Sequence, residues 1–137
     1  MTKEEQKLLL KDLCSRLPYG VVLKCVDPNF KDYVDWKLIK IDIEQNTVVT
    51  TNEVWNDEYL IENIKPYLRS MSSMTQEERD NFQQCLNIIE NENYGDGWSP
   101  AAWGQMAEFI HYCNEHHLDY NGLIAMGLAL EAPEGMY

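Results

Sequence analysis

The chain is 137 residues long, 45% of them hydrophobic, and its 11 basic and 23 acidic residues give a formal net charge of −12. This length and apolar content indicate one globular domain, residues 1–137, and exclude a disordered protein. No lysine or arginine follows Arg79, so residues 80–137 lack the side chains that bind a phosphate backbone, and we expect no direct nucleic-acid binding.

The first predicted element is a helix from Lys3 to Arg16. Thr2 and Glu5 have the spacing of a capping box, in which each side chain accepts a hydrogen bond from the other residue's main chain. Pro18 then ends the helix, because the residue before a proline avoids the helical conformation. The face that we expect in the core carries Leu10, Leu13, Cys14 and Leu17, with Leu9 at its edge.

Alternating apolar residues predict strands next. Residues 20–26 form the first, with Val21, Leu23 and Cys25 on its buried face. A three-residue loop that places Asn46 in the left-handed conformation predicts a hairpin between a second strand, residues 36–43, and a third, residues 47–51.

The second strand has two apolar faces. Its buried face is predicted to carry Ile39, Ile41 and Ile43. Trp36 and Leu38 fall on the opposite face, where either a helix covers them or they form an apolar patch for a partner.

The following segment, residues 52–74, fits a short helix or an edge segment, and Pro66 is expected to break both. Thr75 and Glu78 form a second capping box, which predicts a helix over Gln76–Asn91. Residues 91–98 are rich in asparagine and glycine and indicate a loop.

A third helix is predicted from the cap Ser99 to about His117. Its apolar stripe is expected to hold Trp103, Met106, Ala107, Ile110, Cys113 and His117. The tail from Leu118 indicates a packed irregular segment. The expected fold is therefore α+β, with a small antiparallel sheet of about three strands packed against the N-terminal helix and the two later amphipathic helices.

Three stretches carry a resemblance to a known family: KEEQKLLLKDLCSRLPYGV, IKPYLRSMSSMT and HHLDYNGLIAMGLALEAPEGMY. Together they resemble a family of small uncharacterised proteins of gut Bacteroidales and their phages and mobile elements. The resemblance covers the two ends and the centre of the chain. It implies a bacterial or phage setting, and it transfers no catalytic or binding residue, because that family has no established activity.

The composition also bears on location. The first residues mix charges with apolar side chains, unlike a secretory signal, and the longest uncharged apolar run, residues 122–130, is far shorter than the ~20 residues that span a bilayer. The cysteines are widely spaced without a C-x-x-C pair, which is typical of free thiols in a reducing compartment. We expect a cytoplasmic protein that does not bind membranes.

The strongest chemical candidate is Cys113 with His117, one helical turn apart. The pair would suit two zinc ligands or a thiolate and its base. A zinc site requires further ligands, however, and a reactive thiol requires a positively charged setting. We therefore interpret both residues as parts of the core, expect no cofactor or resident metal, and keep the metal or thiol site as an alternative.

These observations favour a small acidic accessory or protein-binding domain without catalysis and with an unknown protein partner. Its possible interaction surface is Trp36, Leu38 and Trp55. The alternative from the charge is a nucleic-acid mimic, an inhibitor whose carboxylates occupy the basic groove of a DNA- or RNA-binding protein. Against it, the carboxylates of residues 80–137 are spread over a helix, a loop and a tail.

Overall fold

The computed structural model describes residues 1–26, 33–90 and 100–137, so the predicted loop at 91–98 and the cap Ser99 lie outside the described residues. The α+β class is confirmed, but the expectation of about three antiparallel strands is wrong. One mixed sheet has six strands in the order β4-β3-β2-β1-β5-β6. The strands are β1 (Val22–Val26), β2 (Tyr33–Asp42), β3 (Thr47–Thr51), β4 (Asn56–Leu60), β5 (Ile64–Leu68) and β6 (Leu130–Glu131).

The extra strands come from the segment that the sequence left open and from the tail. Neighbouring strands from β4 to β5 pair antiparallel, whereas β5 and β6 pair parallel. Pro66 does not break β5 but lies within it, opposite Leu23 of β1. The proline is tolerated because β6 pairs only with Tyr67 and Leu68, so no strand of the described residues lies beside Pro66 on that side.

The helices are α1 (Lys3–Arg16), α2 (Gln76–Asn81), α3 (Gln83–Glu90) and α4 (Pro100–Glu115), and single 3-10 turns span Leu17–Tyr19, Ile61–Asn63 and Met71–Ser73. Helix α1 has the predicted bounds and capping box, with the Glu5 amide 3.1 Å from the Thr2 hydroxyl. On its buried face, Leu9 is fully enclosed, while the predicted Cys14 is exposed. No helix of the described ranges is long and apolar enough to cross a membrane.

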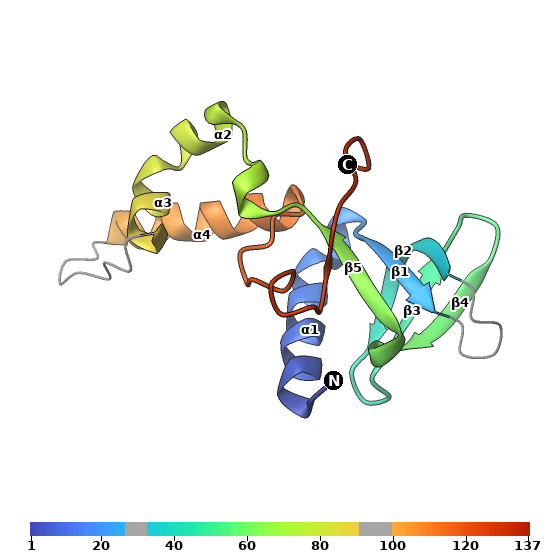
Figure 1. Ribbon diagram of the computed structural model, residues 1–137. Coiled ribbons are helices and arrows are strands. Elements are labelled where there is room, and N and C mark those ends of the chain that lie inside the picture. The colour runs from blue at the N-terminus through green and yellow to red at the C-terminus, as the bar shows by residue number, and fades with distance from the viewer. Residues whose placement is uncertain (27–32, 91–99) are drawn as a thin grey trace.

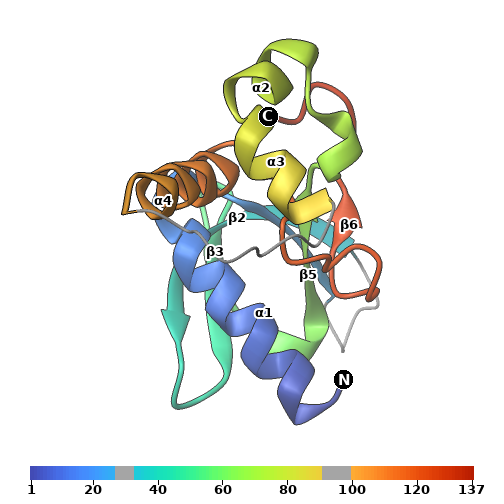
Figure 2. The same cartoon turned by 90° about the vertical axis from the view of Figure 1, so that its left-hand side faces the viewer.

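Of the described helices, α1 alone packs against the sheet in the expected way. Its leucines join the inward side chains of the strands and of residues 123–129 in one hydrophobic cluster. A second cluster holds the later helices together and includes Met74, Cys85, Leu86, Phe109, Cys113 and Leu118. Figures 1 and 2 show α2, α3 and α4 gathered beside the sheet and not spread over its face, so the expectation that these helices cover the sheet is wrong.

The predicted helix over Gln76–Asn91 is broken in two at Phe82, which has a φ of −123°. The Phe82 ring lies against α4, with its centroid 5.2 Å from that of Phe109 and 4.9 Å from that of Tyr112. The break turns the phenylalanine into the second cluster, and its aromatic contacts offset the lost helical hydrogen bonds. The second capping box, between Thr75 and Glu78, is confirmed.

A bulge in β2 overturns the predicted faces of that strand. The register shifts between Leu38 and Lys40, so Leu38 is 1% exposed in the core while Ile39 is turned outward. Ile43, beyond the end of the strand, is exposed as well, and Ile41 alone of the three isoleucines packs on the first cluster. One extra residue reverses the alternation of side chains along a strand, and hydrophobic alternation does not reveal it.

The buried stripe of α4 also differs from the prediction. Phe109 and Cys113 are fully buried, and Met106 and Ile110 pack beside them. Trp103, which the prediction included in the stripe, is 61% exposed. The buried face of α4 is the face that packs against Phe82. The hydrophobic periodicity of α4 alone does not indicate where Phe82 lies.

A buried ion pair within α1 contacts the end of α4. Arg16 and Asp12 are buried, and the guanidinium contacts the carboxylate twice, with Nε–Oδ2 and Nη2–Oδ1 distances of 2.7 and 3.0 Å. Arg16 also donates to the main-chain oxygens of Cys113 and Leu118. Asn121 donates to the same carboxylate at 2.8 Å. These bonds satisfy the buried charges and fix the second cluster relative to the first.

The chain leaves β5 and returns to the sheet at one place. Arg69 follows β5 and forms an isolated parallel bridge with Leu118, beyond α4. Its amide donates to the oxygen of His117 at 2.7 Å, and its oxygen accepts from the amide of Asp119 at 2.8 Å. Arg69 and Leu118, which are far apart in sequence, are thus neighbours at the point where the segment with α2, α3 and α4 joins the sheet.

Candidate protein-interaction site

The structure separates the predicted pair Cys113 and His117. Helix α4 ends at Glu115, and His117 has a φ of +60°, so it does not continue the helical face on which Cys113 lies. The Leu118 amide bonds back to the Cys113 oxygen at 2.8 Å, the arrangement of a helix end that glycine usually closes. Cys113 packs in the second cluster, while the His117 ring stacks on Tyr137.

Neither side chain of the pair is set up for chemistry. Burial raises the pKa of the Cys113 thiol to about 12, which keeps it protonated and a poor nucleophile. Burial, followed by the charge of Arg16, lowers the pKa of His117 to about 4. In the part of the chain that the structure describes, no three histidine, cysteine or acidic side chains are grouped to hold a metal ion.

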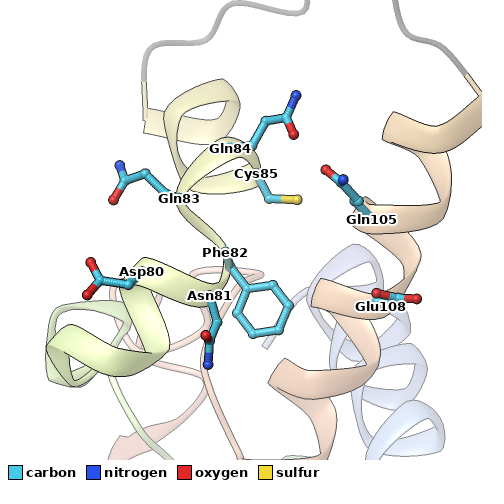
Figure 3. A pocket seen from close by; sticks show the side chains of 8 residues that line it. All are labelled: Asp80, Asn81, Phe82, Gln83, Gln84, Cys85, Gln105 and Glu108. Atoms are coloured by element: carbon cyan, nitrogen blue, oxygen red, sulfur yellow. The ribbon is translucent and has the colours of Figure 1, made fainter.

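A hollow of about 420 Å³ lies at the break between α2 and α3 (Figure 3). Cys85 of α3 and Gln105 of α4 point toward one another in it, whereas Asp80 and Gln83 point away from α4. Burial, and then the charge of Glu108, raises the pKa of the Cys85 thiol. A protonated thiol is a poor nucleophile, and the carboxylates of Asp80 and Glu108 disfavour the binding of an anion, so this hollow is not the candidate site.

The three aromatic and apolar residues of the predicted interaction surface do not form one patch. Leu38 is in the core, and Trp36 is half-buried on the same inward face, directly across from Leu23. Trp55 is 68% exposed and stands alone of the three at the surface. The predicted surface is therefore corrected to Trp55 and its neighbours, because the inward face of β2 lies under α1.

Trp55 lies in the turn between β3 and β4, together with Val54, which is 77% exposed. Main-chain bonding closes this turn between Asn52 and Trp55, with an N–O distance of 3.2 Å. The turn exposes two apolar side chains at consecutive positions, and a tryptophan is among the residues that contribute most to protein interfaces.

Side chains hold the turn in one conformation. The Asn52 carboxamide oxygen accepts hydrogen bonds from the amides of Val54 and Trp55 at 2.9 and 2.7 Å. The Thr51 hydroxyl accepts from the Glu53 amide at 3.0 Å and donates to the Trp55 oxygen at 3.2 Å. Glu53 has a φ of +76°, which a residue other than glycine rarely adopts. A strained conformation held by four local bonds presents Trp55 at low entropic cost to binding.

The sequence indicated Trp55 as a possible surface residue, but the hydrogen-bonded turn that holds it was not predicted. Asn52 precedes Trp55 by three positions, a spacing at which an asparagine side chain commonly bonds the main chain of a turn. No family model, curated protein or solved structure matches the chain.

Proposed function

We propose that this protein is a non-catalytic protein-binding domain of the cytoplasm, which holds its partner at the β3–β4 turn. The observation that carries the proposal is the fixed presentation of Trp55 beside Val54. Exposed apolar side chains usually collapse or remain mobile, whereas four hydrogen bonds order this turn. A main chain that is already ordered loses little freedom on binding, so more of the energy of burying the indole appears as affinity.

The cytoplasmic location is supported by the state of the cysteines. All four are free thiols, and three of them are buried within the clusters, where oxidation to disulfides would require rearrangement. The absence of catalysis is supported by the raised pKa values of the buried thiols Cys25 and Cys113.

Site-specific photo-crosslinking tests the proposal. Trp55 is replaced by benzoylphenylalanine and the protein is irradiated inside its native host. We expect one discrete crosslinked protein. Trp103, which is 61% exposed on α4, provides the matched position, and the probe placed there should give no such product. The same product from both positions, or none from position 55, would overturn the proposal.

The Asn52→Ala substitution, added to the protein that carries benzoylphenylalanine at position 55, tests the setting of that position. It removes the acceptor of two main-chain hydrogen bonds, so crosslinking from position 55 should fall several-fold as the turn becomes mobile. Binding should weaken but persist when salt is raised to about 500 mM, because the apolar contact of Trp55 is not screened. Complete loss of binding at that salt would favour a nucleic-acid mimic instead.

A further inference from the structure

In the part of the chain that the structure describes, strand β4 has one side without a partner strand. It is the last strand of the sheet order, paired with β3 alone. The Ile61 amide bonds to the Asn46 oxygen and the Asn52 amide to the Trp55 oxygen, which fixes the alternation of the ladder. In an antiparallel pair every second residue bonds to the neighbouring strand. The main-chain groups of Asp57 and Tyr59 therefore face β3, and those of Asn56, Glu58 and Leu60 point outward. The Glu58 amide donates to the Asp57 side chain there, a bond that an added strand would replace.

Charge restricts what can occupy that side. Residues 44–64 carry five carboxylates and no lysine or arginine: Glu44, Glu53, Asp57, Glu58 and Glu62. Within β4, Asp57 and Glu58 are both exposed. A second copy of this strand would place carboxylates against carboxylates, which is destabilising between paired strands. The edge thus excludes its own copy and favours a strand of positive charge.

The position of Trp55 also favours a strand added along β4. It directly precedes Asn56, the first residue of β4, so a strand laid along β4 would reach the exposed indole at one end. Hydrogen bonds from the main chain would give such a complex its register, and the indole would provide an apolar anchor. These are the components of recognition by strand addition.

We propose that β4 accepts an extended segment of a partner protein, rich in lysine or arginine, as an additional strand of the sheet. This inference rests on the proposed function and specifies the chemistry of the partner. The alternative role of the carboxylates is to protect an exposed edge from aggregation, and it predicts no binding of basic strands.

The Leu60→Pro variant tests the outward hydrogen bonds without disturbing the inner ladder. Leu60 has a φ of −65°, the value that proline requires, and its amide points away from β3. The substitution removes a donor that an added strand would use. Leu60→Ala is the matched control, because it shortens the same exposed side chain and keeps the amide.

The probe is a library of random twelve-residue peptides displayed on phage and selected in parallel on the wild-type protein, Leu60→Pro, Leu60→Ala and Trp55→Ala. We expect enrichment, on the wild type and Leu60→Ala, of peptides in which lysine or arginine alternates with β-branched residues. A synthetic peptide of the enriched sequence should bind Leu60→Pro at least about tenfold more weakly and lose affinity as salt rises. Thermal melting of each variant verifies that it is folded.

The outcomes separate the two proposals. Peptides that bind Leu60→Pro as well as the wild type, yet fail on Trp55→Ala, would overturn strand addition and leave the Trp55 site in place. Enrichment of acidic or uncharged sequences would likewise overturn the charge argument. Failure to enrich any peptide dependent on Leu60 or Trp55 would overturn strand addition, and the crosslinking experiment then decides the proposed function by itself.

Discussion

The rings of His117 and Tyr137 are stacked, with centroids 3.6 Å apart and planes 16° from parallel. The Tyr137 hydroxyl donates to the Tyr67 oxygen at 2.8 Å and accepts from the Val22 amide at 2.9 Å. His117 is 6% exposed, and its Nδ1 has no hydrogen-bond partner. The stack therefore joins the end of α4 to β1 and β5 through a histidine that is kept neutral.

Neutral burial of His117 makes stability depend on pH. Its pKa is about 4 in the folded protein against 6.5 as the ordinary value, so between these values the unfolded chain binds the proton that the folded protein does not. The free energy of unfolding should fall by up to about 3 kcal/mol as pH decreases through this window. Denaturant unfolding at several pH values measures it.

The His117→Asn variant should lose this pH dependence, because asparagine tolerates the left-handed conformation and does not titrate. His111, which is exposed on α4, gives the control: His111→Asn removes an imidazole without touching the stack. If His117→Asn retained the full loss of stability between about pH 6.5 and about pH 4, the buried imidazole would not be its source.

Glu78 adds a second loss of stability at lower pH. A hydrogen bond from Arg69, at 2.8 Å, is the main cause that lowers the pKa of this carboxyl from 4.5 to about 2, and Tyr112 donates to it at 2.6 Å. Because the pKa of Glu78 is lower in the folded protein, its charged carboxylate stabilises the fold above pH 4.5. This stabilisation is lost as pH falls toward 2. Glu78→Gln should remove about 1–3 kcal/mol of stability at neutral pH and little at about pH 2.

The neighbouring exposed residue offers a matched comparison for that substitution. Glu77→Gln makes the same chemical change in the same turn of α2, at a side chain that does not pair with Arg69. Acid titrations followed by circular dichroism should distinguish the two variants. Equal acid sensitivity in both would show that the Arg69–Glu78 pair does not stabilise the fold.

The buried pair Asp12 and Arg16 should be costly to break and cheaper to replace as a whole. Arg16→Ala leaves the Asp12 carboxylate enclosed without its cation, and we expect a loss of about 3–5 kcal/mol. The double variant Asp12→Leu with Arg16→Met should be less destabilised than Arg16→Ala alone. Chemical denaturation measures the difference, with the exposed Lys11→Ala as control, and a double variant worse than the single one would contradict it.

Neutralising the edge strand should promote self-association. Asp57→Asn with Glu58→Gln removes two carboxylates from β4 while preserving the side-chain oxygen that accepts the Glu58 amide. The repulsion between two edges then falls, and sedimentation should detect dimers at concentrations where the wild type is monomeric. Glu77→Gln with Asp80→Asn lowers the net charge equally on exposed α2 positions, and dimers in that control as well would indicate a general charge effect.

Local signals in the sequence predicted the elements that depend on local chemistry. The capping boxes at Thr2 and Thr75, and Asn46 in the left-handed region at φ 54°, involve residues a few positions apart, so the sequence alone indicates them. The alternation that buried Leu23 and Cys25 is likewise local. Trp55 was the one predicted surface residue that the structure leaves exposed.

The errors arose where distant parts of the chain decide. Phe82 interrupts a good helical pattern because its ring packs on α4, and Pro66 fits a strand because the partner beside it is short. Arg16 was missed although it follows Asp12 by four positions on the face of Leu9 and Leu13, a spacing that signals a possible buried pair. Only the carbonyls at the end of α4 explain why that pair is enclosed.

The bridge between Arg69 and Leu118 has a consequence for how this chain can change in length. The chain leaves the sheet at Arg69 and returns to it at Leu118, which lies beside Arg69. The segment that contains α2, α3 and α4 is therefore an insertion between β5 and β6. A short linker across that bridge would leave the strands, α1 and residues 123–129 with their own hydrophobic cluster. The helices could be replaced at this junction by a segment that supplies an acceptor for Arg16 in place of the Cys113 oxygen, while the acidic edge strand at the far side of the sheet kept its shape.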